Sequence, residues 1–199
     1  MRIKNLFVAA AIAALFPACS QILPPAIQSP KAIEELVADL KKISKDYQIE
    51  KVVVHEKEEL SGSFGMAVAD LRNSNGEAYE QTLYYNFGIP HNDPKPQGRR
   101  QSGRENPHYI NVEDIAARKD LIEKYVEEAK TQIPEGYTFE SADFMVFSTD
   151  DRGEFALSFD LQVTETGKAA RMEGGRHVTD YYTLKFSVDK DGNITHDEW

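Results

Sequence analysis

Cys19 is the only cysteine in the 199-residue chain, and its surroundings indicate a specific processing event. Arg2 and Lys4 are followed by an apolar run from Leu6 to Phe16 and then by small residues around Cys19. A basic start, a short apolar core and small residues at a cleavage point are typical of an export signal. Because a membrane-spanning helix needs roughly 20 apolar residues, this shorter run predicts a cleaved signal and no permanent anchor.

The segment Phe16-Pro17-Ala18-Cys19 resembles the lipobox of bacterial lipoproteins. In that family the signal peptide is cut just before the cysteine, which then carries acyl chains such as palmitate. The resemblance implies a signal peptide over residues 1–18 and attachment to the membrane through lipidated Cys19. It also implies the outer membrane of the bacterial cell envelope, since Ser20 is not the Asp that retains some lipoproteins at the inner membrane. The alternative is ordinary cleavage near Ser20, which would leave a soluble periplasmic or secreted protein.

The charge balance restricts the classes of partner. The full chain has a formal net charge of −10, and removal of Arg2 and Lys4 with the signal leaves −12. Nucleic-acid affinity comes mostly from basic residues that neutralise phosphates, so we expect no nucleic-acid partner. Anionic lipid also attracts basic segments, so the lipid on Cys19 is the only membrane contact we expect. With its one cysteine used there, the mature chain depends on an apolar core and has no internal disulfide.

No constellation of residues predicts a reaction. Nucleophilic catalysis needs a Ser, Thr or Cys beside a base, and the sequence has no G-x-S-x-G elbow and no phosphate-cradling glycine loop. The five histidines lack metal-site spacings such as H-E-x-x-H. The segment Asp189–Asn193 has Gly192 in fourth place, where a calcium loop needs glycine in sixth, so it predicts a hairpin turn. We therefore predict no catalytic residue, no cofactor and no metal, and we favour a non-enzymatic protein. An envelope hydrolase with an unrecognised site is the alternative.

Residues 88–107 combine several prolines with a local cluster of positive charge in this acidic chain. The basic residues are Lys95, Arg99, Arg100 and Arg104. Long loops without secondary structure inside a compact domain are usually functional or act as linkers. We predict that these four side chains form a partner-contact loop.

Two tyrosine pairs, Tyr84-Tyr85 and Tyr181-Tyr182, place aromatic rings on both faces of predicted strands. One ring of each pair is expected in the core. The other is expected at the surface, where it would suit contact with a protein or a glycan. The alternative is a cross-strand aromatic pair that only stabilises the sheet.

Hydrophobic periodicity predicts the elements that position these residues. Ser29-Pro30 supplies an N-cap and a first-turn proline for a helix whose apolar stripe extends to Tyr47. A second helix is predicted from Val112 to Ile133, where Pro134-Glu135-Gly136 ends it. Period-two patterns predict strands near residues 49–58, 64–68, 79–87, 108–112, 138–148, 155–163, 178–188 and 194–199.

This order of elements predicts an α+β fold on a proline-rich tether over residues 19–28. Residues 29–112, which include loop 88–107, and residues 113–199 each read as one helix followed by antiparallel strands. By element order alone, such units resemble cystatin-like folds, and two in tandem resemble the β-lactamase-inhibitory protein. The resemblance implies a protein-inhibitor module. The alternative arrangement is one antiparallel sheet with both helices on one face.

The sequence thus predicts an exported, lipid-anchored envelope protein with a non-enzymatic binding or structural role. Its expected ligand is a protein or a glycan, and the oligomeric state is left open.

Overall fold

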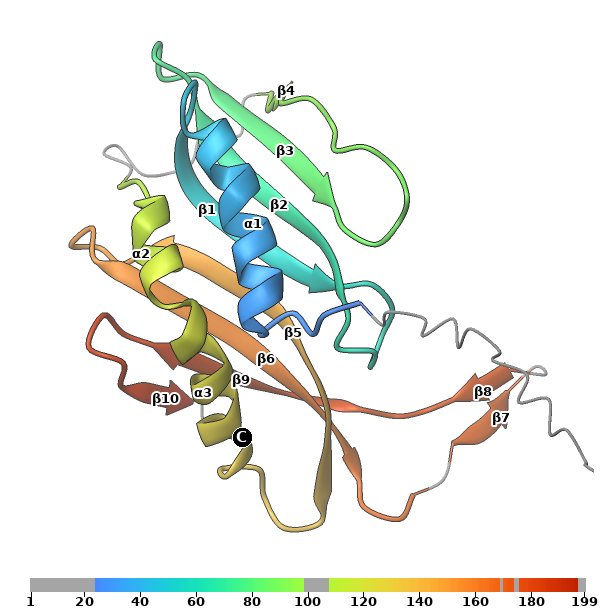
Figure 1. The fold of residues 1–199 in the computed structure, drawn as a ribbon. Coiled ribbons are helices and arrows are strands. Elements are labelled where there is room, and N and C mark those ends of the chain that lie inside the picture. The colour runs from blue at the N-terminus through green and yellow to red at the C-terminus, as the bar shows by residue number, and fades with distance from the viewer. Residues whose placement is uncertain (1–23, 99–107, 169, 174–175, 197–199) are drawn as a thin grey trace, which may run out of the picture.

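The computed structural model describes residues 24–98, 108–168, 170–173 and 176–196. Within these ranges the chain forms a mixed α+β fold that is mostly sheet, which confirms the predicted class (Figure 1). The elements in chain order are α1 (Pro30–Ile43), β1 (Gln48–Glu56), β2 (Phe64–Arg72), β3 (Ala78–Tyr84), β4 (Lys95–Pro96), α2 (Val112–Ala117), α3 (Lys119–Lys130), β5 (Tyr137–Thr149), β6 (Phe155–Glu165), β7 (Arg171–Glu173), β8 (Arg176–Val178), β9 (Tyr182–Val188) and β10 (Ile194–His196).

One antiparallel sheet of eight strands extends through the described fold in the order β10-β9-β6-β5-β1-β2-β3-β4. At its centre, residues 52–54 of β1 pair with residues 145–147 of β5. Outward from this central pair, the strands on each side follow one another in chain order. The first and second halves of the chain therefore contribute one half of the sheet each.

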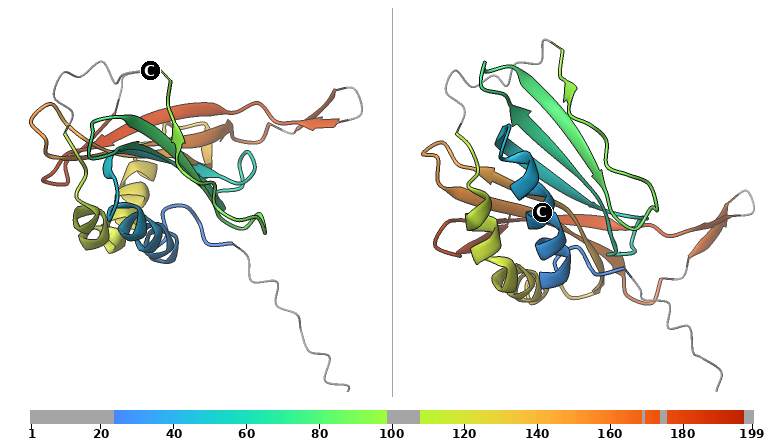
Figure 2. Two further views of the ribbon diagram at one scale, coloured as in Figure 1. Left: turned by 90° about the horizontal axis from the view of Figure 1, so that it is seen from above. Right: turned by 45° about the horizontal axis from the view of Figure 1, so that its top comes forward.

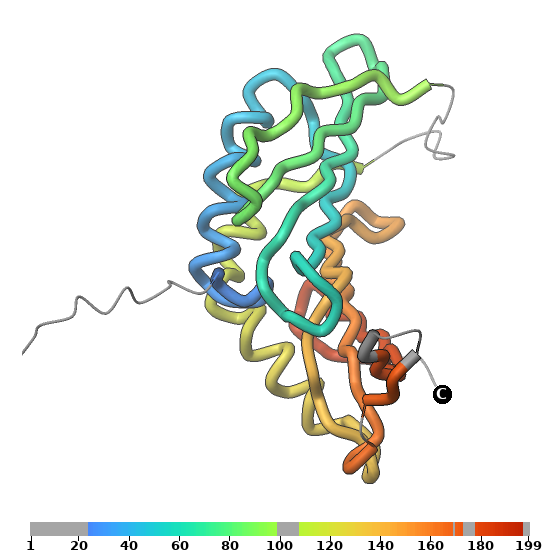
Figure 3. Tube along the Cα trace, turned by 90° about the vertical axis from the view of Figure 1, so that its right-hand side faces the viewer, coloured from blue at the N-terminus to red at the C-terminus, as the bar shows by residue number. Residues whose placement is uncertain are grey.

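The three helices lie together on one face of this sheet, as Figures 2 and 3 show from different sides. α1 packs against α2 and α3, and Lys119 on α3 forms an ion pair with Glu34 on α1. The buried apolar side chains gather between this helix layer and the sheet, and the largest fully buried ones are Phe64, Phe147, Phe159, Ile27, Ile33, Leu36, Leu40, Ile49, Leu71, Leu83, Ile115 and Ile122. No described helix covers the opposite face, which we call the helix-free face.

The start of α1 follows the sequence prediction. The Ser29 side chain accepts a hydrogen bond from the backbone N–H of Ala32 at 3.3 Å, and Pro30 occupies the first turn. The chain before the cap is already part of the folded body. Ile27 is fully buried, and the carbonyl of Pro25 accepts a hydrogen bond from the Phe64 N–H at 2.8 Å. The body therefore begins at Pro25.

The second predicted helix is divided in two at Arg118, between α2 and α3. There the Arg118 guanidinium lies 4.5 Å from the centre of the Phe155 ring. Asn111 caps α2 by accepting a hydrogen bond from the Glu113 N–H.

The predicted strand at residues 108–112 is wrong, because these residues form no strand. The segment makes one backbone bond to β1, from Ile110 N to Ile49 O at 2.8 Å, beyond the three residues of β1 that pair with β5, and it then turns into α2. The strand beside β3 is β4, which lies inside the predicted loop 88–107. A further departure is the short hairpin of β7 and β8, which extends beyond the sheet where a loop was expected (Figure 1).

Candidate binding face

A row of valines crosses the centre of the helix-free face. Successive side chains of a strand point to opposite faces, so fully buried Val52 and Val54 of β1 place Val53 away from the helices. The strand register sets Val53 directly opposite Val68 on β2 and Val146 on β5. This row is half-buried, because only its neighbours in the sheet shield it.

Two larger side chains extend the row. Met66 lies opposite His55 in the register, and the His55 ring meets the Phe144 ring edge-on with 5.0 Å between their centres. We call Val53, Met66, Val68, Phe144 and Val146 together the apolar band. A sheet with one wet face normally carries polar residues there. A continuous apolar band across three central strands therefore needs an explanation.

Phe144 has the most unusual backbone on this face. Its φ is +51°, and it lies in a bulge of β5 between Asp143 and Val146, where the register with β6 shifts. The left-handed conformation costs a residue with a side chain roughly 1–2 kcal/mol. Its side chain is nevertheless 46% exposed. Strain that holds an aromatic ring in solvent is the kind of outlier that suggests a functional role.

A pair of carboxylates lies beside this ring. Asp143 on β5 and Asp160 on β6 are directly opposite each other, a destabilising arrangement for like charges. Asp143 accepts a hydrogen bond from the Glu56 N–H at 2.9 Å. Burial raises the pKa of Asp160 to about 6; the charge of Asp143 adds to this rise, and Lys185 on β9 partly offsets it. Among the described residues, none donates a hydrogen bond to the Asp160 carboxylate.

A shallow hollow of about 690 Å³ adjoins the apolar band at the end of β5, β6 and β9. It includes Ser158, which lies opposite Val146 in the register. The side chains that floor it on the helix-free face are small, namely Ser148, Ala156, Ser158, Ser187 and Thr195. The face therefore combines a raised apolar centre with a depression beside it.

Two turns border this hollow, residues 150–154 and the predicted hairpin turn Asp189–Asn193. Asp150 Oδ1 accepts hydrogen bonds from the N–H groups of Arg152 and Glu154 at 2.8 and 2.9 Å. Asp189 Oδ1 does the same for Asp191 and Asn193, at 2.9 Å each. These two carboxylates hold their own turns, in agreement with a structural role for Asp189. The lining residues include five carboxylates and two cations, a net charge of −3.

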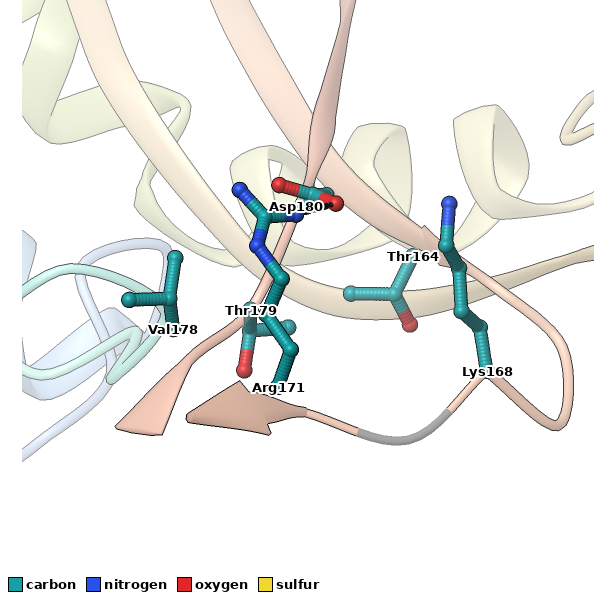
Figure 4. Close-up of a pocket in the computed structure, with 6 residues that line it drawn as sticks. All are labelled: Thr164, Lys168, Arg171, Val178, Thr179 and Asp180. Atoms are coloured by element: carbon teal, nitrogen blue, oxygen red, sulfur yellow. Dashed lines mark hydrogen bonds and ion pairs between the residues drawn. The ribbon is translucent and has the colours of Figure 1, made fainter. Parts of the chain in front are cut away.

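A second and much smaller pocket, of about 60 Å³, lies at the base of the β7–β8 hairpin (Figure 4). It is lined by Thr164, Lys168, Arg171, Val178, Thr179 and Asp180. Arg171 and Asp180 form an ion pair across it. Ligand pockets for small molecules are usually at least 300 Å³, so this pocket is too small to be a candidate site.

The predicted contact loop is described only in part. Lys95 is exposed on β4, opposite Glu80 of β3 at the edge of the sheet. Arg99, Arg100 and Arg104 lie outside the described residues, as does Cys19. The prediction of a basic contact loop therefore stays a prediction.

The two tyrosine pairs differ in outcome. Tyr85 is buried, stacks on Phe64 and donates a hydrogen bond to Asp39, whereas Tyr84 is half-buried on the helix-free face. In the second pair neither ring is buried, because these residues lie at the start of β9, away from the core: Tyr182 is exposed and Tyr181 is half-buried. The expectation of one core ring in each pair is confirmed for the first pair and wrong for the second.

The apolar band itself was not among the predicted site residues. A signal for it exists in the sequence, since residues 52–54 and 144–147 are apolar on both faces of their strands. Which face of such strands is exposed depends on where the helices lie, and no local pattern specifies that.

Other kinds of site have no candidate among the described residues. In the described ranges, no group of three or more His, Cys, Asp or Glu side chains could hold a metal ion. Among the same residues, no helix has the length and apolar character needed to cross a bilayer. Comparisons of the chain with protein-family models, with curated proteins and with solved structures find no match.

Proposed function

We propose that this chain is an exported envelope protein, anchored through lipidated Cys19, that binds a protein partner with the helix-free face of its sheet. The role is non-enzymatic. The export signal and the lipobox-like segment Phe16–Cys19 support the location, and the described face supports the binding role.

The apolar band is the observation that carries the binding role. It lies at the centre of the face, its aliphatic side chains are only half-buried, and Phe144 projects with 46% of its surface exposed. Apolar surface that stays in contact with water is unfavourable by roughly 25 cal/mol for each Å² that a partner could cover. Aromatic residues at the centre of a patch, with polar residues around them, are typical of protein interfaces.

Protein is favoured over glycan as the ligand. Phe144 is the only aromatic side chain in the apolar band, and its other four members are aliphatic, which favours apolar packing of a protein surface over the stacking of sugar rings on aromatic side chains. The hollow beside the apolar band is shallow and open, which suits a protein surface better than the enclosed cleft in which small molecules usually bind.

A second candidate is a protein-inhibitor module built from two tandem α+β units. The observation that favours it is the strand order, in which β2, β3 and β4 extend outward from β1 on one side of the central pair, and β6, β9 and β10 extend outward from β5 on the other. Two similar units joined side by side would produce this order. The helix-free face would then act by covering the active site of an enzyme.

A photoreactive residue tests the binding face directly. It is placed at Val68, in the apolar band, or at the exposed control position Glu123 on α3, in the helix layer. In an envelope fraction from the source bacterium, we expect a discrete cross-linked product from position 68 only, and we expect excess unmodified protein to suppress it. Equal labelling from both positions, or none from position 68, would contradict the proposal.

A further inference from the structure

The charges on the helix-free face are unevenly distributed around the apolar band. Asp143 and Asp160 lie side by side next to Phe144, and the only described cation opposite them in the register is Lys185. Beyond Val146, the adjoining hollow has a net charge of −3. Phe144 thus has the Asp143–Asp160 pair on one side. On its other side, the apolar band ends at the negatively charged hollow.

Asp160 is poorly satisfied in the free protein. Its carboxylate is partly desolvated between two strands, faces Asp143, and accepts no hydrogen bond from the described residues. A buried or half-buried carboxylate normally has a donor, because its desolvation is otherwise uncompensated. A cationic donor from outside would compensate it and would also relieve the repulsion between the two carboxylates.

The hollow beside the apolar band restricts the shape of a partner that covers the whole face. The floor of the hollow consists of serine, alanine and threonine, so a partner must protrude to contact it. Phosphates of nucleic acid and headgroups of anionic lipid would be repelled by the same carboxylates. A convex, basic protein surface would complement both the negative charge of the face and the shape of its hollow.

We propose that the partner is a protein that places an arginine over the Asp143–Asp160 pair while an apolar side chain beside that arginine packs on Phe144. Arginine is preferred because its planar guanidinium has several donors and can bond two carboxylates at once. This inference rests on the proposed function and specifies the chemistry of the partner.

The test uses a defined probe, a cyclic peptide with adjacent tryptophan and arginine at its turn. Its control is the same peptide with citrulline, a neutral isostere of arginine. Titration into the full-length, detergent-solubilised, ¹⁵N-labelled protein is followed by NMR. We expect shifts confined to residues around Asp143, Phe144 and Asp160, and an affinity about tenfold lower for the citrulline peptide. Equal affinity of the two peptides, or shifts centred on the helix layer, would overturn the inference.

Two variants distinguish the effect of the Asp160 charge on peptide binding from a general effect of removing a carboxylate. Asp160→Asn is expected to bind arginine and citrulline peptides alike, whereas Glu123→Gln on α3 keeps the tenfold preference. In the wild type, the affinity for the arginine peptide is expected to rise between pH 5 and pH 7, because the ionised Asp160 carboxylate, which faces Asp143 and Lys185, is the form that binds. A preference that survives in Asp160→Asn would refute the role of this carboxylate.

The two proposals fail in distinguishable ways. If position 68 gives a cross-linked product that excess unmodified protein suppresses, but the two peptides bind equally well, the binding face is supported and the arginine inference is wrong. If cross-linking fails at position 68, the proposed function itself is wrong.

Discussion

Replacing Asp160 with Asn is expected to stabilise the protein at pH 7. Burial, with the charge of Asp143 added and that of Lys185 subtracted, raises the pKa of Asp160 from 3.8 to about 6. A tenfold change in proton affinity corresponds to about 1.36 kcal/mol, so the full rise in pKa would destabilise the folded state by about 3 kcal/mol. Because the side chain is half-exposed, solvent screening reduces this to about 1 kcal/mol. Asparagine removes the charge and keeps the shape, so we expect a gain of that size.

The gain should depend on pH with a definite sign. The folded pKa lies above the unfolded value, so the folded state binds the Asp160 proton more tightly. The destabilisation is therefore fully present above about pH 6, decreases as the pH falls, and is absent below about pH 4. The advantage of Asp160→Asn should disappear over this same interval.

Urea unfolding of both proteins at pH 7, 5 and 4 measures this difference. The matched control is Asp46→Asn in the exposed turn after α1, where we expect no change at any of these values. The reasoning is refuted if Asp160→Asn is less stable than the wild type at pH 7, or if its advantage is the same at pH 4.

Three other contacts give measurable expectations. Phe144→Gly should change the free energy of unfolding by only about 1 kcal/mol, because relief of a positive φ offsets loss of a half-exposed ring. Phe147 is fully buried, so Phe147→Ala should cost about 3–5 kcal/mol. Similar losses for the two variants in urea unfolding would contradict the conclusion that Phe144 is a strained surface residue. Tyr85→Phe removes the hydroxyl that donates to Asp39 at 3.2 Å and should cost about 1 kcal/mol in the same assay, with no loss counting against this bond. Cys19→Ala should release the protein from the membrane fraction, and failure of labelled palmitate to enter the wild type would contradict lipidation.

Local sequence patterns predict most of the elements but not the way they join. The Ser29-Pro30 start of α1 and the strict alternation of β6 follow from capping and burial, which depend on residues close in sequence. The pairing of β1 with β5 joins residues more than 90 positions apart, and no local pattern specifies it. The strand predicted at residues 108–112 failed for the same reason, since the short strand beside β3 is formed by residues 95–96 and no local pattern specifies that pairing.

The binding face was beyond prediction for a related reason. The run Val52-Val53-Val54 predicts a strand that is apolar on both faces, which normally means burial on both faces. All described helices lie on the opposite face of the sheet (Figure 2), so no described helix covers half-buried Val53. The bulge that turns Phe144 outward is likewise set by its pairing with β6, because Phe has no intrinsic preference for a positive φ.

The attachment of Pro25 and Ile27 to the folded body limits how a protein anchored at Cys19 can sit on a bilayer. An extended chain spans at most about 3.5 Å per residue, so the segment from Cys19 to Pro24 separates the lipid from the body by about 20 Å at most. The described chain enters the body directly before α1, on the side of the helices (Figure 2). If the protein is anchored as proposed, so short a connection would keep the helix layer nearer to the bilayer than the helix-free face, and a diffusing partner would reach that face without displacing lipid.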